Sequence, residues 1–149
     1  MLVAYRCIGV VALIAAAVAA STAFADGIEP GLWKITTQTE NAGMPGSTHQ
    51  SSKCLTTAQT SDLGATFSPV ATTINSDCAP IERSLKGPLL SWHLVCKGQL
   101  NMELSGEFDF DSPHHYTGKV RTQADMPGMP NVDSRNTVEG EWVSACPQQ

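Results

Sequence analysis

The chain has 149 residues, a formal net charge of −5 and a hydrophobic fraction of 42%, which suits a single domain. Its lysines and arginines form no run or stripe, so the sequence argues against nucleic-acid binding and against a basic membrane-surface site.

The N-terminus has the layout of a secretory signal peptide. Arg6 supplies a positive charge, and residues 7–20 are an uninterrupted apolar sequence that is predicted to be the signal-peptide helix. Ala23-Phe24-Ala25 gives the small-x-small pattern of a cleavage site. A membrane-spanning helix needs about 20 apolar residues, so this run is short for an anchor. We therefore predict cleavage after Ala25 and export to the periplasm of one domain, residues 26–149, that has no membrane span and is a monomer.

Period-two alternation of apolar and polar residues predicts an all-β domain. It is clearest at residues 100–110, where even positions are apolar or glycine and odd positions are polar. Further strands are predicted at residues 33–39, 49–54, 90–96, 116–124 and 136–143, with a short helix at 56–63. Because short turns join consecutive strands in antiparallel pairs, we expect an antiparallel meander of about six to eight strands curled into an open barrel or a sandwich.

One face of this sheet is predicted to be apolar, and no long amphipathic helix is available to cover it. Large exposed apolar patches are rare on monomers, so the sheet must close, pack face to face or hold a ligand. Gly106 and Gly118 lie inside strands, where glycine commonly marks a bend or bulge, which favours curling. The predicted apolar face comprises Trp33, Ile35, Trp92, Leu94, Leu100, Met102, Leu104, Phe108, Phe110, Val120 and Trp142. Its candidate ligand-facing residues are Trp33, Trp92, Phe108, Phe110 and Trp142.

Four cysteines remain after cleavage, Cys54, Cys78, Cys96 and Cys146, since Cys7 lies in the signal peptide. An even number in an exported chain predicts a disulfide framework, and their wide spacing argues against zinc. Residues 39–46 (TENAGMPG) resemble residues 122–128 (TQADMPG), and each segment precedes a strand that ends in a cysteine. This repeat favours a Cys54–Cys146 bond, and a hairpin turning at Gly87 would bring Cys78 opposite Cys96.

Several motifs resemble the DUF3617 family, exported bacterial proteins of unknown function. They are Pro30-Gly31-Leu32-Trp33-Lys34-Ile35, Met44-Pro45-Gly46, Lys53-Cys54-Leu55-Thr56, Gly140-Glu141-Trp142 and Cys146-Pro147. Lys34 stands where an acidic residue is commoner in that family. The resemblance implies an envelope protein with this fold and adds no reaction.

The sequence contains no recognisable catalytic constellation, which favours a protein that is not an enzyme. There is no G-x-S-x-G elbow. The carboxylates at Glu107, Asp109 and Asp111 and at Glu139 and Glu141 are interpreted as the wet face of strands.

Two functions follow from these observations. The first is a non-catalytic binding or chaperone-like module for an apolar ligand or an envelope protein, with no cofactor. The alternative is a copper-handling protein, because Met44, Met126 and Met129 lie in Pro/Gly loops near His49, and thioethers and imidazole are copper ligands.

Overall fold

The computed structural model describes residues 27–42, 44–70, 76–125, 127–128 and 130–147. The predicted signal peptide and two of the three loop methionines, Met126 and Met129, lie outside the described residues. The described chain forms eight strands and two short helices: β1 Gly31–Asn41, β2 Ser47–Leu55, α1 Thr57–Ser61, α2 Leu63–Thr66, β3 Ser76–Cys78, β4 Glu82–Lys86, β5 Leu89–Gly98, β6 Asn101–Ser112, β7 His115–Asp125 and β8 Val132–Ser144. Within these residues, no helix is long and apolar enough to cross a membrane.

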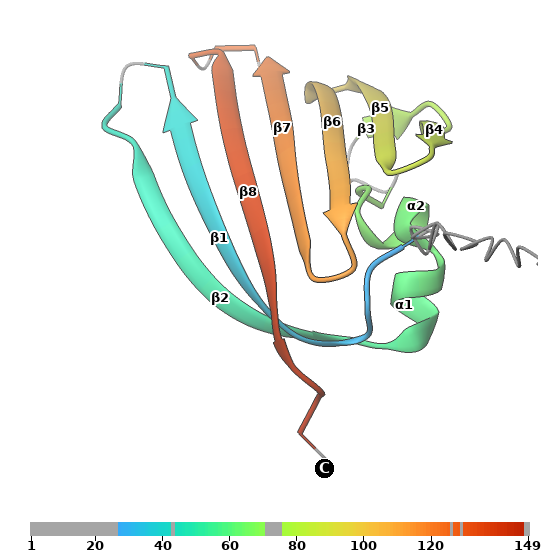
Figure 1. Cartoon of the computed structure of the whole chain (residues 1–149). Helices are drawn as coiled ribbons and strands as arrows, with labels where there is room; N and C mark the ends of the chain where they lie inside the picture. The colour runs from blue at the N-terminus through green and yellow to red at the C-terminus, as the bar shows by residue number, and fades with distance from the viewer. Residues whose placement is uncertain (1–26, 43, 71–75, 126, 129, 148–149) are drawn as a thin grey trace, which may run out of the picture.

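All strands pair antiparallel in one open sheet, which confirms the predicted all-β class. The order is β2-β1-β8-β7-β6-β5-β3, with β4 also pairing with β5. Strands β5 to β8 form the expected meander, whereas the β1–β2 hairpin pairs with the last strand, β8 (Figure 1). The sheet does not close on itself, in agreement with the open form that was expected, so its apolar face must be covered in another way.

The predicted strands correspond to β1, β2 and β5 to β8, whereas β3 and β4 were not predicted and Leu100 was placed wrongly. That residue was expected on the apolar face, but it lies in the turn before β6 and is only half-buried. The turn takes it because β5 continues to Gly98 and β6 begins at Asn101.

Gly106 and Gly118 do not mark bulges, which rules out one of the two alternatives, a bend or a bulge, that the sequence offered for them. The pairing register is continuous at both glycines, and the irregularities fall between Leu32 and Trp33 and between Asp109 and Ser112. A Cβ on Gly106 would lie within 2.3 Å of the Trp92 ring, and one on Gly118 within 2.4 Å of the Phe108 ring. An aromatic ring from the neighbouring strand therefore occupies the space that a side chain at each of these glycines would need.

The helical segment supplies the cover that the sequence did not reveal. Helix α1 begins with a capping box between Thr56 and Gln59, and the Asp62 side chain accepts a hydrogen bond from the Ala65 amide to start α2, the usual signals of a helix N-terminus. Just after α2, Phe67 lies with its ring 4.9 Å from Tyr116 and 5.0 Å from Phe110. The short α1–α2 segment between β2 and β3 thus covers the apolar face of the sheet.

One cluster of buried side chains results, as predicted for the apolar face. Of the expected residues, Trp33, Trp92, Leu94, Phe108 and Phe110 are buried, whereas Ile35, Leu104, Val120 and Trp142 are partly buried against the cluster. Met102 is half-buried on the same face. The cluster also includes Ile28, Leu55, Leu63, Leu90 and Tyr116.

The sulfur atoms of Cys54 and Cys146 are bonded, as are those of Cys78 and Cys96, which is the pairing that the sequence favoured. Cys78 lies opposite Cys96 in the β3–β5 ladder, and the first bond joins β2 to the residues after β8. Residues 79–81 separate β3 from β4, at the point where the alternation in the sequence is irregular.

Candidate functional site

The N-terminal segment of the described chain closes one end of the core. Trp33, which is fully buried, donates its indole N–H to the Glu29 carbonyl at 3.0 Å, and Trp142 donates its own to the Pro30 carbonyl at 3.3 Å. The Glu29 amide donates to the Pro113 carbonyl at 2.9 Å. A Cβ on Gly31 would lie 2.2 Å from Trp142 Nε1. The Pro-Gly-x-Trp sequence therefore fixes this segment beneath Trp142, so Trp33 and Trp142 have structural contacts in addition to any role in ligand binding.

A cavity of about 620 Å³ borders this closed end, between α2, the β4–β5 turn and the end of β6. Its apolar lining consists of Leu63, Leu85, Pro88, Phe110 and Pro113. Leu85 is 54% exposed, which is unusual for a large apolar side chain beside such a cavity. Of the five predicted ligand-facing residues, Phe110 is the one that lines it.

A smaller cavity of about 280 Å³ lies beside Phe67. Phe108, Tyr116 and Val138 line it together with Ile35 and Leu55. This volume is below the range of about 300–1,000 Å³ that is typical of small-molecule sites, so the Phe110 cavity is the better candidate on the apolar side.

Tyr116 is the central side chain of this region. It is 1% exposed, and its ring centroid lies 5.3 Å from that of Trp33. Burial raises the pKa of the Tyr116 phenol to about 12, because the phenolate would lose its hydration. The side chain therefore stays neutral at physiological pH and acts as a packing residue.

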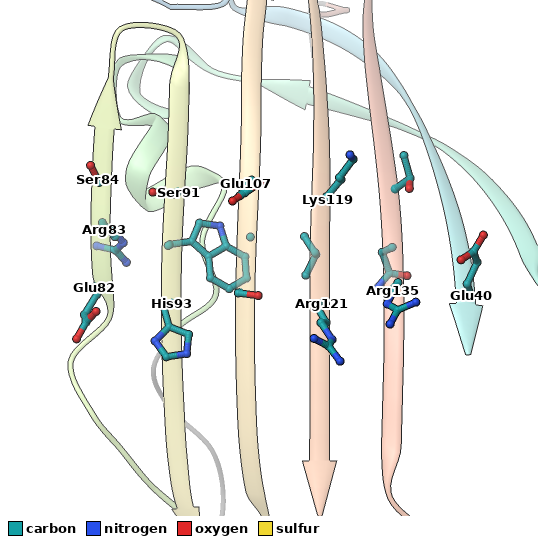
Figure 2. Close-up of a pocket in the computed structure, with 16 residues that line it drawn as sticks. Glu40, Glu82, Arg83, Ser84, Ser91, His93, Glu107, Lys119, Arg121 and Arg135 are labelled. Carbon is teal, nitrogen blue, oxygen red and sulfur yellow. The ribbon is translucent and has the colours of Figure 1, made fainter. Parts of the chain in front are cut away.

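The opposite face of the sheet is polar and also hollowed. A hollow of about 640 Å³ extends over β4 to β8 and β1 (Figure 2). Its charged side chains include Glu40, Glu107, Lys119, Arg121 and Arg135. Trp92 borders it from the other face, and its indole nitrogen is buried without a hydrogen-bond partner among the described residues.

The histidines form ion pairs at the edges of this face. His115 Nδ1 lies 2.8 Å from both carboxylate oxygens of Asp111, and its Nε2 lies 3.4 Å from Glu139. The hydrogen bond with Asp111, aided by Glu139, raises the pKa of His115 against the opposing effect of burial. His93 pairs with Glu103 at 3.0 Å. These contacts give the predicted wet-face carboxylates a structural role in strand pairing.

His114 extends the closed end of the core. Its ring stacks on Trp142 with centroids 4.9 Å apart, and its Nε2 lies 3.2 Å from the Glu29 carboxylate. The Pro113–His114 turn therefore holds both the N-terminal segment and β8.

The hypothesis that the loop methionines and His49 bind copper stays a prediction. Met44 is 64% exposed, and His49 is exposed on β2, while Met126 and Met129 are not among the described residues. The two loops that carry the methionines do belong to adjacent hairpins, because β1 pairs with β8 and the Ala42 amide donates to the Asp133 carbonyl. Over the described part of the chain, no group of three or more His, Cys, Asp or Glu residues is placed to hold a metal ion.

The sequence was also compared with known proteins. The sequence model of a family described as "Protein of unknown function (DUF3617)" matches residues 28–146. No curated protein and no solved structure matches the chain. The matched range begins at Ile28, the first buried residue of the closed end, and ends at Cys146, so it contains the whole sheet and both disulfides.

Proposed function

The chain belongs to the DUF3617 family, whose function is unknown, and we propose that it is a non-catalytic binding module of the cell envelope that holds an apolar ligand beside Phe110. The two disulfides fit an oxidising compartment outside the cytoplasm. The observation that carries the proposal is the cavity of about 620 Å³ lined by Leu63, Leu85 and Phe110.

The size and chemistry of this cavity support an apolar occupant. Small-molecule sites typically occupy about 300–1,000 Å³ and are lined mainly by apolar side chains. A ligand here would cover Leu85, whose exposure leaves apolar surface in water, and burial of such surface contributes about 25 cal/mol per Å². The polar side chains of the lining are Asp109, Asp111 and Ser112, which lie at its border with the end of β6.

Two leucines of one hairpin provide a matched test. Leu85 is 54% exposed and lines the cavity, whereas Leu89 is 55% exposed and lines a hollow on the opposite face. We expect the Leu85→Glu variant to bind the neutral apolar dye Nile red at least roughly tenfold more weakly than the wild type, because a carboxylate would have to be desolvated. Leu89→Glu, at the same exposure, should bind the dye like the wild type.

Fluorescence titration measures both affinities. Equal loss in the two variants, or no dye binding by the wild type, would contradict the proposed site. Native mass spectrometry of protein purified from its own envelope then identifies the occupant. A retained small apolar molecule supports the proposal, and a retained polypeptide would replace the ligand with a protein partner.

A further inference from the structure

The hollow on the polar face is a separate feature from the Phe110 cavity. The two share no lining residue, and they lie on opposite faces of the sheet. Figure 2 labels cations of the hollow on β7 and β8 and a further one, Arg83, on β4, and it labels carboxylates on β4, β6 and β1.

The positively charged side chains of this hollow lie close enough to repel one another, which lowers the stability of the folded chain. Arg121 on β7 lies directly opposite Arg135 on β8 in the strand register, and like charges in that position repel one another. Lys119 lies two residues before Arg121 on β7 and so faces the same side of the sheet. In a chain with a net charge of −5, this grouping is not a by-product of a generally basic surface.

Internal pairing neutralises only part of this charge. Asp133 accepts two hydrogen bonds from Arg121, at 3.2 and 3.0 Å, and lies 4.0 Å from Arg135 Nη2. Arg135, whose side chain is 65% exposed, has no hydrogen bond within the described chain, and Lys119 has no ion pair there. Arg135 and Lys119 therefore keep their donors available, and a guanidinium binds a phosphate or carboxylate with two parallel hydrogen bonds.

The carboxylates around this centre restrict which anion can bind. Glu107 lies opposite Lys119, and Glu40 lies opposite Arg135. They repel a bare anion, but they accept hydrogen bonds from hydroxyl groups. Ser91 and Ser105 add hydroxyl groups to the lining.

We propose that the polar-face hollow binds a hydroxylated anion of the sugar-phosphate class. Lys119 and Arg135 hold the phosphate, and Glu40 and Glu107 accept hydrogen bonds from the hydroxyl groups around it. This inference is independent of the proposed apolar ligand, because neither the residues nor the face of the sheet is shared.

Isothermal titration calorimetry of the full mature chain with glucose 6-phosphate, inorganic phosphate and glucose tests this site. The wild type should bind glucose 6-phosphate more tightly than either of the other two. Arg135→Gln should weaken that binding about tenfold or more, since it removes hydrogen bonds to a charged group. Lys53→Gln, which removes a lysine of β2 outside the hollow, should leave the affinity unchanged.

A Glu107→Gln variant separates the roles of the two charge types. It should bind inorganic phosphate more tightly than the wild type, because a repulsive charge is gone, and its preference for glucose 6-phosphate over phosphate should shrink. The proposal is overturned if glucose 6-phosphate does not bind at millimolar concentration, if glucose binds as tightly, or if Arg135→Gln and Lys53→Gln have equal effects. Far-ultraviolet circular dichroism verifies that each variant is folded.

Discussion

At the scale of single residues, the most informative groups are those whose partners come from distant strands. His115 illustrates this, because it contacts Asp111 across the β6–β7 turn and Glu139 on the neighbouring strand β8. Neither contact could be predicted from the sequence, since the Asp111 contact depends on the β6–β7 turn and the Glu139 contact on the β7–β8 register. The sequence predicted carboxylates on this strand face, but it did not predict that Asp111 and Glu139 would contact the His115 ring from two sides.

The raised pKa of His115 predicts a pH-dependent contribution to stability. The protonated ring is favoured in the folded state, so its contribution is fully present below the unfolded pKa of about 6.5 and is lost as the pH rises through the folded pKa. Replacing His115 with Gln should therefore reduce the free energy of unfolding more at about pH 5.5 than at about pH 9, where both proteins lack the charge. Urea denaturation at the two pH values measures the difference.

The matched control is His49→Gln, on the exposed edge strand β2. A stability difference between the His115→Gln variant and the wild type that is the same at both pH values would contradict the ion-pair interpretation. Because the His115 side chain is about one-third exposed, solvent screening keeps the effect small.

At the scale of strands, three glycines and three aromatic rings set how the sheet packs. Trp92 of β5 lies over Gly106 of β6, Phe108 of β6 lies over Gly118 of β7, and Tyr116 of β7 lies over Gly140 of β8. Each ring covers the glycine of the next strand. Phe67 packs against two of these rings, with its ring centroid 5.3 Å from that of Phe108 and 4.9 Å from that of Tyr116.

An alanine at Gly140 should disrupt this arrangement. Its Cβ would lie 2.1 Å from the Tyr116 ring, which is buried and cannot move aside. Overpacking of this kind typically costs about 1–3 kcal/mol, so the Gly140→Ala variant should unfold at lower denaturant concentration. Gly46→Ala is the control, because its Cβ would meet no atom closer than 3.4 Å. Equal stability of the two variants would show that the ring does not need the glycine.

At the scale of the whole molecule, an open sheet is stabilised by its insertion and its crosslinks. The α1–α2 segment covers the apolar face, and the residues around Glu29 and His114 close one end. The Cys54–Cys146 bond joins positions 92 residues apart, whereas Cys78–Cys96 joins positions 18 apart. The longer loop restricts the unfolded chain more strongly.

Removal of the long-range disulfide should therefore be the more destabilising change. In the chain-entropy description, a loop of that length gives about 4.5 kcal/mol and the short loop about 3 kcal/mol. The double variant Cys54→Ala, Cys146→Ala should accordingly lose more stability than Cys78→Ala, Cys96→Ala, as measured by denaturation followed through tryptophan fluorescence. The reverse order would mean that packing around buried Cys96 outweighs the loop entropy.

The sequence by itself determined the apolar face and every strand except β3 and β4, because alternation is a local property of the chain, and its repeated segments favoured the observed disulfide pairing. It also contained the signals for a short helix at residues 56–63, which the structure places in α1 and the start of α2. Only the tertiary structure decided that Phe67 fills the apolar face, that Gly106 and Gly118 receive rings, and that Arg121 lies opposite Arg135. These features depend on the register between strands and on how an insertion packs on a sheet, and both are set by contacts between residues that are far apart in the chain.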